Sequence, residues 1–129
     1  MSAPEKIQAK LDKYTREREN LLARLREVGF ICHGSVHRSL LTCGRPACRC
    51  HEDRDARHGP YAYWTTKVAG KTVSRLLPPD EADLYEEWIE NRRRLERIVR
   101  ELKALSAKAA PLILKLRSKA SGEPRKTVS

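Results

Sequence analysis

The chain has 129 residues, of which 40% are hydrophobic and 34% are charged, and its formal net charge is +10. This length suits one domain with a short tail, and so few apolar residues predict a thin core that needs support from a metal ion or a helix–helix seam. The sequence contains no apolar run long enough for a signal peptide or a bilayer span, so we expect a cytoplasmic protein without membrane contacts.

The positive charge is concentrated in two segments. Residues 29–79 hold eight Lys/Arg against three acids, and residues 106–129 hold six against one. The charges of residues 1–28 and 80–105, +2 and −2, cancel each other. A basic excess of this kind indicates an anionic partner, and DNA or RNA is the usual one. A solvated basic surface without a partner is the alternative.

The first predicted element is an amphipathic helix over residues 5–28. Its apolar residues recur at alternating steps of four and three, and Gly29 is a stop signal. Residues 34–79 then predict a β module of about three antiparallel strands. Ser35–Thr42 is a candidate strand, and Tyr61–Leu77 is typical of a hairpin that turns at Ala69-Gly70.

A second amphipathic helix is predicted over residues 81–106, with Asp80 as its N-cap. We expect the two helices to pair antiparallel, with Leu25 opposite Leu84. In that register the one polar residue of each apolar stripe falls in the same layer, Arg18 opposite Asn91. Such a buried polar layer costs stability but fixes the register, as in coiled coils. The same seam could form between two chains, which would make a homodimer.

Beyond this helix, residues 111–129 predict a short helix that begins at Pro111, followed by a basic disordered tail. Residues 1–110 are predicted to form one α+β domain. Its antiparallel pair of long helices, a helical hairpin similar to a coiled coil, would bracket the small β-sheet.

Three of the four cysteines lie within eight residues. Reduced, clustered thiols in a cytoplasmic protein bind metal more often than they form disulfides. Structural zinc takes four tetrahedral Cys/His ligands, and a complete shell leaves no open position for catalysis. The spacing C-x4-C-x-C, followed by a histidine seven residues later, therefore predicts one structural Zn2+ that staples the sheet. The predicted ligands are Cys43, Cys48, Cys50 and His58.

Other ligands and another chemistry are alternatives. His51 is less favoured than His58 because it adjoins Cys50, and neighbouring residues seldom bind one ion. Cys32 is more typical of a small buried hydrophobic residue. A redox role for Cys48 and Cys50 is also open, because Arg49 between them would lower thiol pKa values.

The motifs "GSVHRSLLTCGRPACRC", "HGPYAYW" and "GKTVSRLLPP" resemble an uncharacterised family of small prokaryotic domains. That family combines a Cys-Gly-Lys/Arg-Pro-x-Cys-x-Cys knot with His-Gly-Pro-Tyr, a hairpin and a following long helix. The resemblance runs over residues 34–105 and implies the same four metal ligands. Members of the family often lie near transposase genes or in mobile elements, which implies a role in nucleic-acid transactions.

We expect no enzyme, because the acids at positions 52, 53 and 55 lie in a hydrophilic loop and "AGKT" lacks the rest of a phosphate-binding loop. The favoured function is a zinc-stapled module that binds DNA or RNA, with basic side chains on phosphates and Tyr61, Tyr63 or Trp64 on bases. The alternative is an adaptor whose helical arm docks on a transposase, a recombinase or a second copy. The predicted nucleic-acid contacts are Arg45, Arg49, Arg54, Arg57, Tyr63, Lys67, Lys71, Arg75, Lys115, Arg117 and Lys119.

Overall fold

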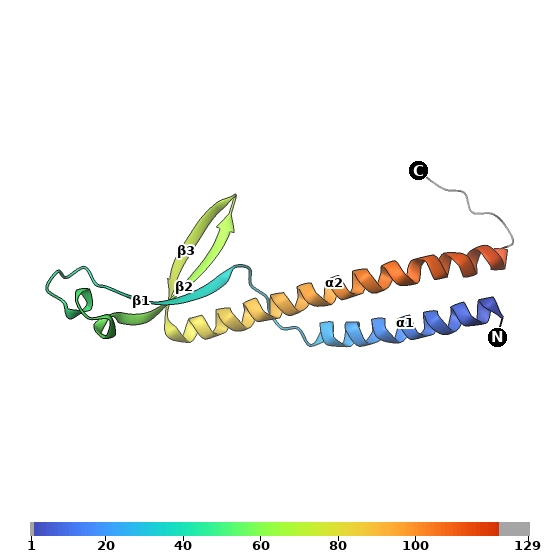
Figure 1. Cartoon of the computed structure of the whole chain (residues 1–129), viewed down its shortest axis with the longest axis horizontal. Coiled ribbons are helices and arrows are strands. Elements are labelled where there is room, and N and C mark those ends of the chain that lie inside the picture. Colours follow the sequence, from blue (N-terminus) through green and yellow to red (C-terminus); the bar gives the residue numbers. More distant parts are fainter. Residues whose placement is uncertain (1, 122–129) are drawn as a thin grey trace. The chain divides into compact units, whose positions relative to one another are not determined.

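The protein is α+β, as the sequence predicts. The computed structural model describes residues 2–121, with side chains up to residue 118. No helix within these residues has the length and apolar character that crossing a bilayer requires. In chain order the elements are helix α1 (Ala3–Arg26), strand β1 (Ser35–Leu41), 3-10 turns η1 (Arg49–His51) and η2 (Arg54–Ala56), strands β2 (His58–Val68) and β3 (Lys71–Leu77), and helix α2 (Pro79–Ser121) (Figure 1).

These elements divide into two compact units. Described residues up to 28, together with those from 94 to 121, form the helical unit, and residues 29–93 form the β unit. The sequence predicts one domain over residues 1–110, and that prediction stays a prediction. Helix α2 belongs to both compact units, because its first turns pack in the β unit while its later turns pack in the helical unit.

The helical unit consists of α1 and the later turns of α2. Ser2 caps α1, because its Oγ accepts a hydrogen bond from the Glu5 N–H at 3.4 Å. Arg24 of α1 forms an ion pair with Glu101 of α2 at 3.0 Å. Leu11, earlier in α1, lines a groove with residues near position 113, later in α2, so the two helices are antiparallel. Their buried cluster consists of Leu21, Ile98 and Leu105, with Tyr14, Leu25, Val28 and Leu102 packed against it.

The predicted register, with Arg18 opposite Asn91, is wrong. Asn91 belongs to the β unit, where its Nδ2 donates a hydrogen bond to the Phe30 carbonyl at 2.8 Å. Arg18 instead pairs with the neighbouring Glu19 at 2.9 Å. Both apolar stripes repeat with the same period, so several registers bury leucines equally well. Helix α1 packs against residues of α2 that lie farther along the helix than the predicted register requires, among them Ile98 and Leu105.

Helix α2 also runs farther than predicted. It continues without a break through Pro111, so the predicted end at residue 106 and a separate short helix beginning at Pro111 are both wrong. Proline inside a helix loses one backbone hydrogen bond and costs about 3 kcal/mol. The alanines and leucines on either side are strong helix formers and continue the helix past it. The predicted disordered tail beyond residue 121 lies outside the described residues.

The β unit contains an antiparallel sheet in the order β1-β2-β3. Both strand predictions are confirmed, although β2 starts at His58, three residues before the predicted hairpin. Val68 pairs with Lys71, so Ala69 and Gly70 form a two-residue turn with φ values of 51° and 80°. Positive φ at both positions is the geometry of the primed turns that join hairpin strands.

The two faces of this sheet differ. Because side chains alternate along a strand, every second residue lies on the same face. One face packs on the first turns of α2, and its cluster consists of Ala62, Leu77 and Ala82, with Val36, Trp64 and Tyr85 packed against it. The opposite side, here termed the open face, carries Ser35, His37 and Ser39 of β1, Tyr61, Tyr63, Thr65 and Lys67 of β2, and Thr72, Ser74 and Leu76 of β3.

Candidate metal centre

Strand pairing brings the two ends of the cysteine loop together. In the β1–β2 ladder Leu41 faces His58. Cys43 follows Leu41 by two residues, so it emerges beside the start of β2, where His58 lies. The loop between them, residues 42–57, carries the other two cysteines and is here termed the metal loop. The antiparallel sheet therefore sets the distance across the site.

Within the metal loop, backbone hydrogen bonds turn the cysteines inward. The Arg45 carbonyl accepts hydrogen bonds from the Cys48 N–H at 3.1 Å and from the His51 Nε2 at 2.9 Å. Turn η1 follows and contains Cys50. Asp53 then caps η2, its Oδ1 accepting from the Asp55 N–H at 3.0 Å. These bonds satisfy the backbone of a loop that has little apolar packing of its own.

The four predicted ligands lie together. Their ligand atoms all fall within 4.8 Å of one another. The Sγ atoms of Cys43 and Cys50 are 3.6 Å apart, and Cys48 Sγ lies 3.3 Å from His58 Nε2. Zinc–sulfur and zinc–nitrogen bonds of about 2.3 and 2.0 Å in a tetrahedron require separations of about 3.8 Å between two sulfur atoms and about 3.5 Å between sulfur and nitrogen. The donor set and its spacing therefore fit one four-coordinate metal ion.

The thiols have different electrostatic environments. Hydrogen bonds from the Cys50 backbone N–H and then from the His58 side chain lower the pKa of Cys48 to about 6. Burial raises the pKa of Cys50, which is 2% exposed. Cys50 Sγ also accepts a hydrogen bond from the Cys43 N–H at 3.3 Å, as a metal-bound thiolate commonly does. None of the four cysteines, all of them described, forms a disulfide.

The less favoured ligands lie outside this cluster. His51 is occupied by its hydrogen bond to the Arg45 carbonyl, which explains why His58 rather than His51 completes the site. Cys32 lies in the segment that leads to β1 and is partly buried. Its N–H donates to the Trp88 carbonyl at 3.1 Å and its carbonyl accepts from Arg92 Nε at 3.1 Å, so its backbone is bound to α2.

The fold and this cluster define a small α+β protein with a Cys3His cluster whose spacing can hold a metal ion. The family model described as "Domain of unknown function (DUF6788)" matches residues 5–87, and the chain belongs to this family. No curated protein and no solved structure matches the chain.

The predicted nucleic-acid contacts fall on three surfaces. Arg45, Arg49, Arg54 and Arg57 are exposed on the metal loop, and Arg49 pairs with Asp53 at 3.2 Å. Lys67 and Lys71 are exposed near the hairpin turn, and Tyr63 lies half-buried on the open face. Lys115 and Arg117 are exposed on α2, whereas the side chain of Lys119 lies outside the described part of the chain.

Two of the predicted contact residues also make contacts within the β unit. Trp64 packs on Tyr85, with ring centroids 5.4 Å apart, and its Nε1 donates to the His33 carbonyl at 2.8 Å. The guanidinium of Arg75 lies 5.6 Å from the Trp64 ring centroid and 5.3 Å from that of Tyr85. These contacts place Arg75 and Trp64 on the α2 face of the sheet.

Arg38, which was not among the predicted site residues, joins the sheet to α2. Its guanidinium binds Asp83 and Glu86 of α2, each at 3.0 Å. These carboxylates also raise the pKa of Arg38. Arg38 is paired with Ala62 in the sheet, and strand alternation from Val36 would have placed it on the α2 face.

Proposed function

We propose that this protein is a small zinc-binding, basic nucleic-acid-binding protein that assists transposition or recombination of a mobile element. The metal is proposed to be zinc because three thiolates and one imidazole in a tetrahedron are the usual ligands of structural zinc. Its four protein ligands are Cys43, Cys48, Cys50 and His58. With all four positions filled, the ion stabilises the metal loop and offers no site for catalysis, so no enzymatic role is assigned.

The observation that carries the nucleic-acid proposal is the separation of charge in the β unit. None of the residues of β1, β2 and β3, all of them described, is acidic. Two acids of the first turns of α2, Asp83 and Glu86, are held by Arg38 on the other face of the sheet. The open face and the hairpin end therefore carry only positive charge. Such one-sided basic surfaces attract phosphates and make binding dependent on salt.

The metal loop extends this basic surface. It holds four arginines against three acids, and one of those acids, Asp53, is engaged by Arg49 and by the cap of η2. A zinc ion that orders the loop would fix these arginines beside the start of β2. Ordered charges bind phosphates better than mobile ones, because less side-chain and loop entropy is lost on binding.

Charge-neutralising variants test the proposal. Each phosphate contact contributes about −0.9 to the slope of log K against log salt on duplex DNA, and about −0.7 on single strands. Replacing three contacting basic residues by glutamine should therefore flatten the duplex slope by up to about 2.7. The slope is measured by fluorescence anisotropy. A labelled oligonucleotide is titrated with the zinc-loaded full chain at several salt concentrations. The triple variant of the β unit changes Arg45, Arg49 and Lys71.

A second triple variant and a control complete the set. Changing Lys115, Arg117 and Lys119 tests the basic end of α2, and we expect a similar loss of slope without a change in base preference. The control removes the same charge from the exposed face of α1 and should leave the slope unchanged. It changes Lys6, Lys10 and Lys13.

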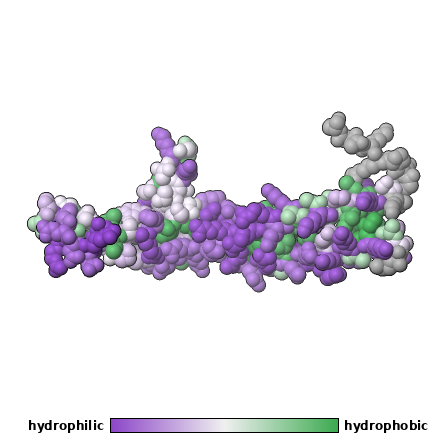
Figure 2. All heavy atoms as spheres, in the orientation of Figure 1, coloured by the Kyte–Doolittle hydropathy of each residue, from purple (hydrophilic) through white to green (hydrophobic). Residues whose placement is uncertain are grey.

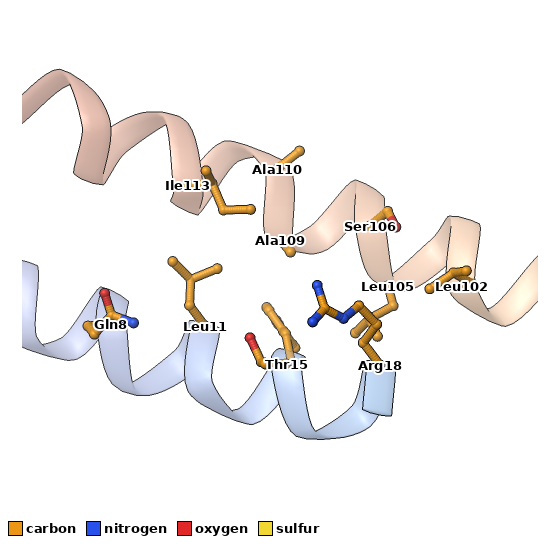
Figure 3. Close-up of a pocket in the computed structure, with 11 residues that line it drawn as sticks. Gln8, Leu11, Thr15, Arg18, Leu102, Leu105, Ser106, Ala109, Ala110 and Ile113 are labelled. Atoms are coloured by element: carbon orange, nitrogen blue, oxygen red, sulfur yellow. The ribbon is translucent and has the colours of Figure 1, made fainter. Parts of the chain in front are cut away.

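The adaptor function is the second candidate, and a groove in the helical unit favours it. The groove has a volume of about 390 Å³ and lies between α1 and α2. Figure 3 shows Leu11 and Arg18 of α1 pointing toward Ala109 and Ile113 of α2. Apolar surface also gathers over the last described turns of α2 (Figure 2), where Ile113 is 52% exposed. This face suits a second copy, since the apolar surface of each helix pair would cover that of the other.

The same titration decides between the two candidates. If the folded, zinc-loaded chain binds neither duplex nor single strands at low salt, the nucleic-acid proposal fails and the helix-mediated adaptor replaces it. If binding is lost wholly with the α2 substitutions, the metal loop and sheet serve protein docking instead. The neighbouring genes test the association with mobile elements. The proposed compartment is the cytoplasm, where thiols remain reduced and available to zinc.

A further inference from the structure

The open face of the sheet is unusual in what it presents to solvent. Tyr63 lies in its centre, and the strand register places His37 and Leu76 on either side of it. Tyr61 is the next residue of β2 on the same face, and the two side chains are separated by roughly 6.7 Å along the strand. Tyr61 is 38% exposed and Leu76 is 54% exposed. The face thus offers two aromatic rings, an imidazole and an apolar side chain to a ligand.

These aromatic rings are not needed by the core. The core of the β unit lies on the opposite face, where Trp64 packs on Tyr85 at 5.4 Å. Tyr61 also forms one wall of a groove of about 500 Å³. Pro60, Leu76 and Pro78 line the same groove, so it provides flat and apolar surface beside the ring.

Positive charge lies at both ends of the open face. Lys67 is exposed on the open face near the hairpin turn, and Lys71 is exposed beside that turn. At the other end of β2, the metal loop presents Arg57 immediately before His58. No acidic side chain lies on any of the three strands. Exposed aromatic rings between cationic ends are the features by which sheets bind unpaired bases and their phosphates.

We propose that the open face binds single-stranded nucleic acid, with bases stacked on Tyr61 and Tyr63 and phosphates held by Lys67 and the arginines of the metal loop. This inference rests on the proposed nucleic-acid function and specifies its ligand. A duplex hides the flat faces of its bases inside the helix, so tyrosine rings on a sheet can stack only on unpaired bases. The salt-dependent phosphate contacts serve either form, whereas the stacking contacts serve single strands.

The test compares tyrosine variants on two ligands. The probes are a labelled oligothymidine of about 16 nucleotides and a duplex of the same length, each titrated with the zinc-loaded full chain. Replacing Tyr63 or Tyr61 with alanine should weaken oligothymidine binding by about 5-fold to about 100-fold, because each base loses its stacking partner. Duplex binding should stay unchanged. Tyr63→Phe keeps the ring and should retain affinity, and Thr65→Ala on the same face is the matched control.

A second measurement needs no variant. An oligonucleotide that carries a photoreactive uracil should cross-link the unmodified chain at Tyr61 or Tyr63, as mass spectrometry of the peptides would show. Cross-links only at other residues, or alanine variants that keep their zinc and bind oligothymidine like the parent, would overturn the open-face site while leaving the nucleic-acid function standing. A chain that binds neither probe would overturn both.

Discussion

Replacing Cys50 with serine is expected to abolish stoichiometric metal binding and to unfold the metal loop. Cys50 is the most deeply placed ligand, at 2% exposure, and its Sγ lies 3.6 Å from Cys43 Sγ. Apparent binding free energies of structural zinc in small domains are about 10–16 kcal/mol, so the proposed ion would supply much of the loop's order. Loss of one thiolate would therefore remove the main support of a loop whose other side chains are largely exposed.

Elemental analysis and circular dichroism measure the effect of Cys50→Ser. We expect less than one zinc per chain and a loss of strand signal, with helix signal retained because the helical unit has its own core. The matched control is Cys32→Ser, which should keep one zinc per chain because Cys32 lies outside the cluster. Should the Cys50 variant keep a full zinc content and fold normally, the four-ligand assignment is wrong.

Replacing Gly34 with alanine is expected to destabilise the β unit by about 3 kcal/mol or more. Gly34 has φ of +90°, which L side chains rarely adopt. An added Cβ would lie 2.3 Å from the Thr65 carbonyl oxygen and 3.0 Å from Trp64 Nε1. The first of these is a backbone atom of the central strand, so relief of the clash requires movement of β2 itself.

Thermal or urea unfolding measures this change. Gly44→Ala is the matched control, because a Cβ there meets nothing within 4 Å. Gly44 lies next to the ligand Cys43, so the control also shows whether the metal loop tolerates an added methyl group. Equal stability of the two variants would mean that residues 33–35 do not pass β2 as closely as described.

The candidate metal site was predictable because its four ligand residues lie close together in the sequence, between residues 43 and 58. The cysteine spacing and the nearby histidine restrict the ligands to a few combinations. The β1–β2 pairing, which was not predicted from the sequence, then brings Cys43 toward His58. The choice of His58 over His51 could be made from sequence, because His51 adjoins a ligand. What sequence could not show is that the Arg45 carbonyl binds the His51 side chain, which lies outside the cluster of four ligand residues.

The helix register was not predictable because the same spacing of apolar residues recurs along α2, so several registers would bury the leucines of α1 equally well. Leu21 meets Ile98 and Leu105, yet the apolar stripe of α2 offers leucines at the same spacing elsewhere. The coincidence of Arg18 with Asn91 in the predicted register was misleading. Asn91 does not lie in the helix seam, because its side chain donates a hydrogen bond to the Phe30 carbonyl in the segment that leads to β1. Such a side chain–backbone contact leaves no periodic signal in the sequence.

The roles of the basic residues were predictable only in part. Net charge showed that residues 29–79 are basic, but it could not separate Arg38 and Arg75, which contact α2, from Lys67 on the open face. Strand alternation separates them once the register is known. The partition of charge between the two faces of the sheet is therefore a property of the fold, and the proposed function depends on it.

The affinity of the full chain for a labelled single-stranded oligonucleotide, measured before chelation, after chelation and after zinc is restored, tests the proposed zinc-stabilised nucleic-acid-binding module most directly. We predict that the zinc-loaded chain binds, that removal of the metal weakens binding as the metal loop loses its order, and that added zinc restores both the strand signal and the affinity. Equal affinity with and without the metal, or no binding by the zinc-loaded chain, would contradict it.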